Sequence, residues 1–268
     1  MDDLVSKFNP ITLSEMNAVK LLNRTDTKFV TSTEKLKQLL MLAHNDYRIL
    51  VADGKRISPY YTVYFDTDDL DMFRRHQAGH ADRQKLRIRS YVSSQLNFLE
   101  IKTKDNHKRT RKQRVTITGF DSTNTPHDIT FHSGHEQRFG TCDDFLNQNL
   151  YYAPGELIEQ IENRFNRITL VNRGMTERLT IDTDLRFHNI ATGRDFAFTN
   201  TAIIELKRDG NVPSPILAIL RQLRIKPMGF SKYCIGTILT NPHVRYNRFK
   251  PRLHAIEKIE QKQLIKYY

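Results

Sequence analysis

The sequence predicts an α+β fold whose antiparallel sheet closes into a barrel with a charged interior and helices packed outside. The predicted strands follow one another through short connections, which is typical of antiparallel sheets. Charged and apolar side chains alternate within several of these strands, so each has one charged and one apolar face. Helical segments with apolar stripes are available to cover the apolar face, which leaves the charged face inside.

Capping residues and apolar stripes mark the predicted helices. Thr12 with Glu15 three residues later forms a capping box, and Ser32 or Thr33 can cap the next helix. The predicted helices span residues 12–22, 33–43, 66–77, 142–149, 154–165, 213–223 and 232–240, and residues 256–268 form a charged helical tail.

β-Branched and aromatic residues in alternating patterns mark the strands. The predicted strands span residues 24–30, 47–52, 60–66, 83–92, 96–104, 111–118, 168–173, 177–187, 195–199 and 202–207. Residues 121–140 are polar and weakly periodic, which indicates a long hairpin or a mobile insertion. We expect a single domain over residues 1–268, with a core over about 20–240 and a charged tail over 250–268.

Composition narrows the class of protein. Lys and Arg total 42 against 30 Asp and Glu, and the net charge of +12 implies a negatively charged partner. A hydrophobic content of 38% with 15 Phe and 11 Tyr excludes a disordered chain, and no apolar run approaches the roughly 20 residues of a membrane span. Cys142 and Cys234 are too few for a disulfide framework or a zinc site, and no secretory signal is visible, so we expect a cytoplasmic protein.

The charged face of the strand over residues 83–92 is the most informative pattern. It carries Arg83, Lys85, Arg87 and Arg89 at every second position, about 6.6 Å apart. At that spacing, unit charges repel by roughly 2 kcal/mol at an effective dielectric constant near 20. A solvated face of an amphipathic sheet is the simpler interpretation of any one strand. Four like charges in a row nevertheless favour an anion among them.

Chains of phosphate groups suit such a face, because Arg supplies forked donors to phosphate oxygens and Lys supplies point charges. An isolated carboxylate such as Glu205 would repel phosphate unless it holds a divalent cation that bridges to it. The sequence has no glycine-rich phosphate-binding loop, so side chains would have to bind the phosphates.

Eight short segments give the chain a resemblance to a known family. They occur in family order between about residues 20 and 240: Asn23–Lys28, Tyr64–Thr67, Lys85–Tyr91, Leu99–Lys102, Asn172–Arg173, Arg178–Asp182, Ile204–Lys207 and Phe230–Tyr233. In these segments the chain resembles the VTC domain, the polyphosphate-polymerase domain of the vacuolar transporter chaperone complex, within the triphosphate tunnel metalloenzyme superfamily.

The resemblance implies an eight-stranded tunnel whose basic walls hold the triphosphate of ATP or the polyphosphate product. The residues that it implies as catalytic phosphate contacts are Lys28, Arg87, Arg89, Lys102, Arg173, Arg178 and Lys232. Further substrate contacts expected on the tunnel walls are Arg24, Arg83, Lys85, Lys104, Lys112 and Lys207. Glu205 is implied as the ligand of a catalytic Mn²⁺ or Mg²⁺, and Glu100 and Asp182 on the same faces are further candidates.

One departure from the superfamily bears on the reaction. Hydrolytic members begin with Glu-x-Glu-x-Lys, whereas this chain has Arg24, Asp26 and Lys28 at those positions. An Arg in place of the first carboxylate reduces metal ligation and adds affinity for phosphate. The resemblance therefore predicts a metal-dependent polyphosphate polymerase acting on ATP and inorganic polyphosphate or pyrophosphate, more than a triphosphatase.

Two other functions stay open on sequence grounds. A triphosphatase or polyphosphatase would use the same tunnel with water as the acceptor. A non-catalytic module that binds polyphosphate or nucleic acid would draw on the basic stretch Lys102–Arg114. That stretch has no aromatic residues between its cations, so base stacking and a nucleic-acid partner are not expected.

Overall fold

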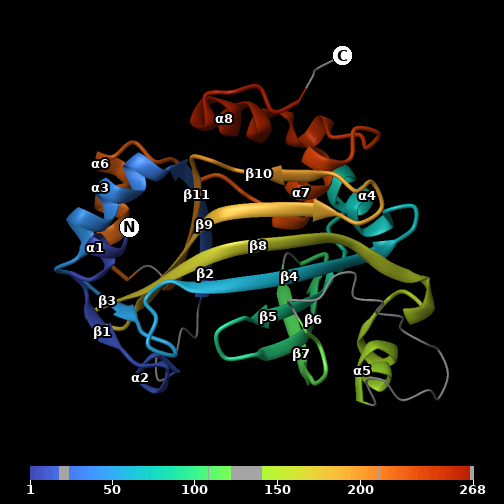
Figure 1. Cartoon of the computed structure of the whole chain (residues 1–268), viewed down its shortest axis with the longest axis horizontal. Helices are drawn as coiled ribbons and strands as arrows, with labels where there is room; N and C mark the ends of the chain where they lie inside the picture. The colour runs from blue at the N-terminus through green and yellow to red at the C-terminus, as the bar shows by residue number, and fades with distance from the viewer. Residues whose placement is uncertain (18–23, 108, 122–140, 211, 266–268) are drawn as a thin grey trace.

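The computed structural model describes residues 1–17, 24–107, 109–121, 141–210 and 212–265 (Figure 1). The strands are β1 (Asn9–Ile11), β2 (Arg24–Ser32), β3 (Tyr47–Leu50), β4 (Ser58–Thr67), β5 (Leu86–Tyr91), β6 (Leu96–Lys104), β7 (Thr110–Ile117), β8 (Leu157–Asn172), β9 (Glu177–Asn189), β10 (Asp195–Ala197) and β11 (Thr201–Asp209). The helices are α1 (Asp2–Val5), α2 (Leu13–Asn17), α3 (Thr33–Ala43), α4 (Asp71–Ala78), α5 (Thr141–Asn149), α6 (Pro215–Gln222), α7 (Lys232–Thr240) and α8 (Lys250–Glu260), with short 3₁₀ turns η1 (Pro154–Glu156) and η2 (Asn247–Phe249).

Eight of the strands form one continuous antiparallel path in the order β2-β11-β9-β8-β4-β5-β6-β7. β3 adds to β8, β10 adds to β9, and β1 pairs with β3 in parallel. The predicted α+β class with a large antiparallel sheet is confirmed; the sheet has 11 strands, eight of them in this path, and the predicted closure into a barrel by strand pairing is not seen in the described residues. β2 and β7 are the two ends of the path, and in the described part of the chain they do not pair with each other.

The segment after α6 covers part of the free edge of β2. The Met228 amide donates to the Lys28 carbonyl over 2.8 Å, and Pro227 forms a bridge with Phe29. Four residues after Pro227, Ser231 accepts a hydrogen bond over 2.7 Å from Lys85, the residue before β5. This segment therefore links β2, at one end of the strand path, to the start of β5 near the other end.

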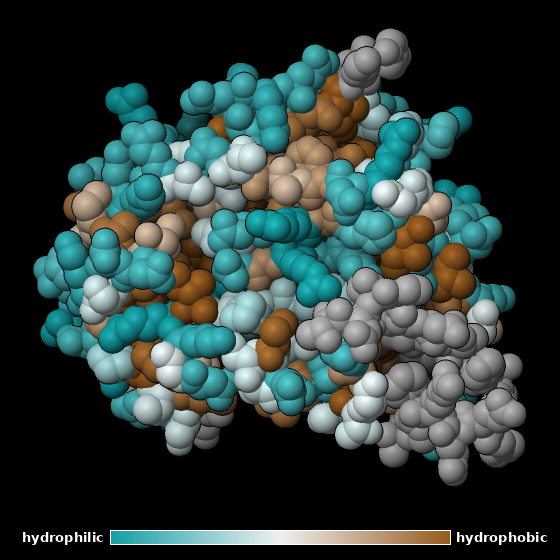
Figure 2. Space-filling view, in the orientation of Figure 1, coloured by the Kyte–Doolittle hydropathy of each residue, from teal (hydrophilic) through white to brown (hydrophobic). Residues whose placement is uncertain are grey.

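Two apolar clusters lie on the face of the sheet opposite its charged side chains, and we call this the outer face. In the first, α3 and α6 pack on β8, β9 and β11, where Leu36, Leu40, Ile204, Ile216 and Leu220 are almost fully buried. In the second, α5 packs on β4, β5 and β6. Not all of the outer face is covered: Figure 2 shows a band of hydrophilic side chains across the middle of the molecule, over β9 and β8. Arg164 and Arg186 lie opposite each other on these two strands, and both are exposed.

A third cluster closes one end of the sheet. α7 packs with α4 and α8 against Tyr64, Phe165, Phe187 and Ile203, and every residue of α7 over 233–238 is buried. Figure 1 shows these helices together on one side of β9 and β10. The C-terminal part of the chain thus completes the core, and it also brings α7 to the sheet.

Several predicted elements are wrong in kind or extent. Residues 154–165, predicted as a helix, are the η1 turn and the first part of the 16-residue strand β8. The strand predicted from Arg83 begins at Leu86, and Arg83 makes only an isolated bridge with Lys104. The helix predicted over 66–77 is α4, which begins at Asp71 because residues up to Thr67 belong to β4. The helix predicted over 256–268 is α8, which ends at Glu260.

Other predictions fall partly outside the described residues. The helix predicted over 12–22 is described only as α2, and the segment predicted as a hairpin or insertion is described only at Asp121. Cys142 and Cys234 are free and buried.

None of the helices in the described part of the chain is long and apolar enough to cross a bilayer.

A buried carboxylate joins α4, β4 and α7. Asp66 at the end of β4 is fully buried and accepts hydrogen bonds from the amides of Met72 and Phe73 in the first turn of α4, at 2.8 and 2.9 Å. The Tyr233 hydroxyl of α7 donates to the same carboxylate. Asp66 therefore satisfies amides at the start of α4 that have no partner within the helix.

We expect Asp66→Ala to lower the free energy of unfolding by about 2–4 kcal/mol, because it leaves buried donors without an acceptor. Urea denaturation measures this change. Asp69→Ala is the matched control, since Asp69 pairs with Arg74 at the surface and should cost less than about 1 kcal/mol. Equal losses in the two variants would contradict the role assigned to Asp66.

Candidate active site

One face of the strand path carries the charged side chains that the sequence singles out, and we call it the inner face. On β5 and β6, strand register places Arg87 opposite Glu100, and the adjacent rung places Lys85 opposite Lys102. β7 continues these rungs, with Arg114 opposite Glu100 and Lys112 opposite Lys102. Side chains directly opposite each other on antiparallel strands lie about 5 Å apart, so the rungs form one charged wall.

The other end of the strand path forms a second charged wall. Lys28 of β2 lies opposite Glu205 of β11, and Lys207 lies opposite Arg178 of β9. Burial raises the pKa of Glu205, but Lys28, Lys207, Arg167 and Lys102 together hold it well below its ordinary value. Lys102 belongs to the first wall, so the two walls lie close enough for their charges to act on each other.

Two carboxylates of the inner face are each bonded to two cations. Glu100 pairs with Arg87, at 2.7 Å from Nη2 and 2.8 Å from Nε, and with Lys112. Burial raises the pKa of Glu100, but the neighbouring cations outweigh burial and lower it to about 2. Asp182 accepts two hydrogen bonds from Arg167, at 2.6 and 2.8 Å, and pairs with Lys232. These carboxylates fix the positions of the cations around them.

Glu205 is held more loosely. Its oxygens lie 3.6 Å from the Lys28 Nζ and 3.4 Å from the Lys207 Nζ, and its side chain is 19% exposed. Both distances are longer than a good hydrogen bond, so the carboxylate keeps lone pairs free.

Arg89 is the cation of the inner face that most needs a partner. It is only 7% exposed, and its Nε makes no hydrogen bond to the described part of the chain. Burial lowers the pKa of its guanidinium, and the nearby charges of Arg87 and Arg167 lower it further. The Tyr60 ring, 5.8 Å away, is its closest aromatic contact. A guanidinium stays charged in proteins, so burying Arg89 without a partner costs free energy. An anion bound at this point would offset that cost and the repulsion from Arg87 and Arg167.

α7 adds further cationic contacts from the side of the C-terminal segment. Ser231 caps the helix by accepting from the Cys234 amide, and it also accepts from Lys85. The next residue, Lys232, pairs with Asp182 and lies 4.0 Å from the centre of the Phe165 ring. Burial is the main cause that lowers the pKa of Lys232, to about 7.

The structure brings most of the sequence-predicted residues onto the inner face. They are Lys28, Lys85, Arg87, Arg89, Lys102, Lys112, Arg178, Lys207, Lys232, Glu100, Asp182 and Glu205. Arg83 and Lys104 form the last rung of the same wall, at its edge. Arg24 is the first residue of β2 and lies opposite Asp209. Arg173 is exposed in the turn after β8, where its amide donates to Asp46, and it is not part of the rungs.

Sequence reasoning missed Arg167. It lies on β8 opposite Asp182, and its guanidinium is 4.8 Å from the Tyr60 ring centre and 5.2 Å from that of Phe165. Arg167 falls between the helix predicted over 154–165 and the strand predicted over 168–173. Arg167, Thr169 and Val171 are two residues apart, as residues on one face of a strand are. This spacing is the signal that could have identified Arg167 as a strand residue.

A metal ion fits this donor set only together with phosphate. No group of three or more His, Cys, Asp or Glu side chains that could hold a metal occurs in the part of the chain that the structure describes. Mg²⁺, however, is commonly bound through one or two carboxylates plus phosphate oxygens of the substrate. Glu205, with free lone pairs beside cations that attract phosphate, suits that mode better than Glu100 or Asp182, which are already bonded to two cations each.

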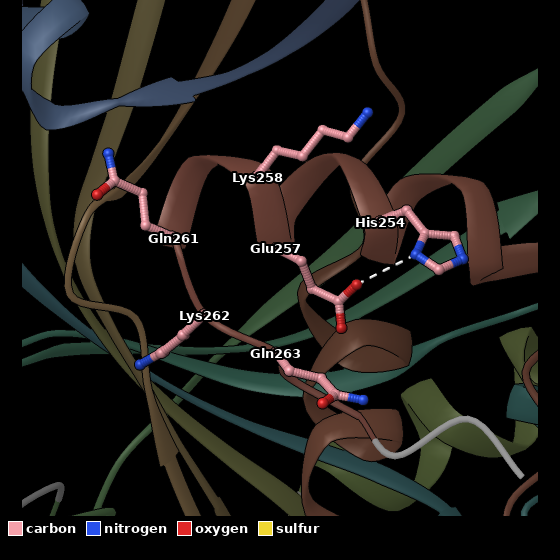
Figure 3. Close-up of a pocket in the computed structure, with 6 residues that line it drawn as sticks. All are labelled: His254, Glu257, Lys258, Gln261, Lys262 and Gln263. Carbon is pink, nitrogen blue, oxygen red and sulfur yellow. Dashed lines mark hydrogen bonds and ion pairs between the residues drawn. The ribbon is translucent and has the colours of Figure 1, made fainter.

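A large surface hollow lies elsewhere. It has a volume of about 700 Å³ and is lined by long polar side chains at the end of α8, from His254 to Gln263 (Figure 3). Glu257 accepts there from His254 over 3.1 Å and from the Leu264 amide over 2.9 Å. These bonds hold the turn that follows α8, and the hollow shares no residue with the inner face.

Comparison with known proteins agrees with the inner-face chemistry. The family model of the VTC domain matches residues 23–241. The chain belongs to the VTC domain family. Family membership and the cationic inner face together indicate an enzyme that acts on phosphates. A search of curated proteins finds no match.

The solved structures that the chain is similar to are distant in sequence. A candidate adenylate cyclase from Bacillus halodurans is 17% identical, with a TM-score of 0.49, over 78% of this chain and 96% of that chain. A candidate adenylyl cyclase from Hippeastrum, described as having a dominant triphosphatase activity, is 15% identical, with a TM-score of 0.48, over 80% of this chain and 94% of that chain.

The low pKa of Glu100 predicts how stability depends on pH. Its folded pKa of about 2 lies below the ordinary value of 4.5, so its ion pairs stabilise the fold above pH 4.5. This contribution, about 3 kcal/mol, is lost as the pH falls from 4.5 towards 2. Relative to Glu100→Gln, the wild type should therefore have a constant advantage above pH 5 that shrinks below pH 4.5.

Denaturation at a series of pH values measures that difference. Glu156→Gln, at an exposed glutamate, is the control and should follow the wild type at every pH. An advantage over Glu100→Gln that stays constant down to pH 2.5 would show that Glu100 is not held by these cations.

Proposed function

We propose that this chain is a metal-dependent polyphosphate polymerase, which transfers the γ-phosphate of ATP to the end of an inorganic polyphosphate chain and releases ADP. The observation that carries the proposal is the buried Arg89, which lies near the charges of Arg87 and Arg167 and has no ion pair with a carboxylate among the described residues. Cations on the inner face also outnumber carboxylates, so the face as a whole favours a polyanion. Membership of the VTC domain family supports the same class of substrate.

The reaction needs positioning more than it needs a base. A terminal oxygen of the polyphosphate attacks the γ-phosphorus and forms a new P–O bond, while the bond from the γ-phosphorus to the β–γ bridging oxygen breaks and ADP leaves. The attacking oxygen is already ionised near pH 7, so no side chain has to remove a proton. Catalysis then rests on alignment and on stabilising the charge of the transferred group.

The side chains of the inner face are suited to these tasks. Arg87 and Arg167 are held by Glu100 and Asp182, so their remaining N–H groups can bind phosphate oxygens in fixed positions. Arg89, which like Arg167 lies near the Tyr60 ring, would bind the same phosphates. Lys28 and Lys232 add point charges from two other elements. Arg173 is exposed just after β8, and we propose that it contacts phosphate there, outside the rungs of the inner face.

Glu205 would hold Mn²⁺ or Mg²⁺ together with phosphate oxygens, as its free lone pairs allow. Such an ion would neutralise charge on the triphosphate and orient it. Lys28 and Lys207, at 3.6 and 3.4 Å, keep Glu205 ionised and ready to bind it.

The first test incubates the purified protein with ATP and Mn²⁺ and follows the products by phosphorus NMR. Polymerase activity gives internal phosphoanhydride signals together with ADP. Orthophosphate without polymer would indicate a triphosphatase instead, and binding of polyphosphate without turnover would indicate a binding module.

Glu205→Gln should lower turnover at least about 100-fold, because it removes the charged metal ligand. It should also remove the dependence of ATP binding on Mn²⁺, which calorimetry can measure without catalysis. Glu156→Gln is the control and should keep both properties. Full metal-dependent turnover in Glu205→Gln would remove Glu205 from the site.

Arg167→Ala should weaken binding of tripolyphosphate at least tenfold, because it deletes a fixed guanidinium of the inner face. Arg164→Ala is the matched control: it lies on the same strand, but its side chain is exposed on the outer face over the Tyr61 ring. Fluorescence competition measures both affinities. Equal effects of the two substitutions would show that the inner face is not where tripolyphosphate binds.

A further inference from the structure

The charged wall of β5 and β6 continues to its edge. Arg83 and Lys104 exchange backbone hydrogen bonds of 3.0 and 2.9 Å, one rung beyond Lys85 and Lys102. Rungs on one face follow each other at about 6.6 Å, so a chain of phosphates bound along Arg87 and Lys85 would reach Arg83 and Lys104 next.

The C-terminal segment brings two more arginines to this edge. Phe249 of η2 packs edge-on against His76 of α4, with ring centres 5.6 Å apart. Arg248 precedes Phe249 and donates from Nη1 to the Ala78 carbonyl over 3.4 Å, and Arg252 lies over the Phe249 ring at 5.2 Å. The contact between Phe249 and His76 therefore fixes both arginines beside the end of α4.

Arg83 also contacts the chain just after the end of α4. Its Nη1 donates to the carbonyl of His80, two residues after Ala78. We call Arg83, Lys104, Arg248 and Arg252 the outer cluster. Its members come from the strand wall and from the C-terminal segment, and they meet around the last turn of α4.

Electrostatic effects show that these cations lie close together. Burial lowers the pKa of the Arg83 guanidinium, and the charge of Arg248 lowers it further. Burial is also the largest cause that lowers the pKa of His76, to about 2, followed by the charges of Lys85, Arg83, Arg252 and Lys104. His76 is therefore neutral, and the ionic neighbours that act on it most strongly are all cations. An anion would relieve this repulsion.

Nothing in the proposed reaction uses Arg248 or Arg252. Both lie beyond residue 241, where the match to the VTC domain ends. Arg248 is exposed and Arg252 half-buried, so both can contact a ligand in solvent.

We propose that the outer cluster is a second phosphate site, which binds the part of a linear polyphosphate that extends beyond the inner face. The proposal rests on the proposed function, because it takes polyphosphate as the ligand of the inner face. Its consequence is a preference for long chains: tripolyphosphate can occupy the inner face alone, whereas a longer chain also contacts the four cations of the outer cluster.

The test compares calorimetric affinities for tripolyphosphate and long-chain polyphosphate. The variant is Arg248→Ala with Arg252→Ala. The control, Lys37→Ala with Lys258→Ala, removes the same charge from exposed positions on α3 and α8. We expect the variant to lose about tenfold in affinity for long chains, which corresponds to two solvent-accessible Arg–phosphate contacts, and to stay within about twofold for tripolyphosphate. Its affinity for long chains should also depend less steeply on salt.

Several outcomes would overturn the outer cluster as a second site. In the variant, they are an unchanged affinity for long chains or an equal loss of affinity for both ligands. In the control, the outcome is a loss of affinity equal to that of the variant. In the wild type, it is an equal affinity for tripolyphosphate and long chains. If the wild type binds long chains but neither tripolyphosphate nor ATP, the proposed function is contradicted, whereas the outer cluster is still supported as a phosphate site. Arg248→Gln with Arg252→Gln repeats the test if the alanine variant does not fold, and thermal melting shows whether each variant is folded.

Discussion

Repulsion between like charges on the inner face is the constraint on which the rest of the structure depends. Neighbouring cations on one strand repel by roughly 2 kcal/mol even at a moderate effective dielectric constant. Glu100 and Asp182 compensate part of this repulsion, and each bonds two cations from different elements. Removing one partner of such a buried pair typically costs 3–5 kcal/mol, because the other charge remains buried. The compensation is incomplete around Arg89, and that is where the structure favours a bound anion.

The same constraint explains why the C-terminal part of the chain packs where it does. Lys232 of α7 shares Asp182 with Arg167, and Ser231 accepts from Lys85, so α7 contributes to the charged face as well as to the core. Asp66 and Tyr233 hold α7 beside α4. The inner face is therefore formed by strands and by a helix that must dock correctly, which couples its geometry to the stability of the third apolar cluster.

Much of this arrangement could be predicted from the sequence, because strands expose their periodicity directly. The alternation over Arg83–Arg89 predicts the charged face of the first wall. The expected positions of Lys102 and Lys207 on the tunnel walls agree with the inner face of the structure, but their strand partners were not predicted. Periodicity fails where the ladder is irregular. β8 shifts register against β4 near Glu159, and its apolar residues Leu157, Ile161 and Phe165 are four apart, which also suits a helix. For this reason Arg167 was missed.

A second irregularity limits the prediction on β9. Asp184 follows Asp182 at strand spacing, so regular alternation would place both on the charged face. The ladder with β8 shifts register at this point, and Asp184 adopts a left-handed backbone with φ of 54°, so it is exposed. Pairings between distant segments, such as Arg248 with the end of α4, were also beyond prediction, because no local pattern encodes which surfaces meet.

The way in which phosphate would be bound has a consequence for the reaction that we propose. A glycine-rich loop encloses one terminal phosphate in a fixed ring of amides. A ladder of side chains at regular spacing instead offers similar donors to every phosphate along a chain, so moving the chain by one unit replaces each contact with an equivalent one. A growing polymer needs that property, whereas hydrolysis of a single triphosphate does not. The extension of the ladder from Arg89 to Arg83 and Lys104 is therefore better explained by a chain that moves than by a ligand that stays.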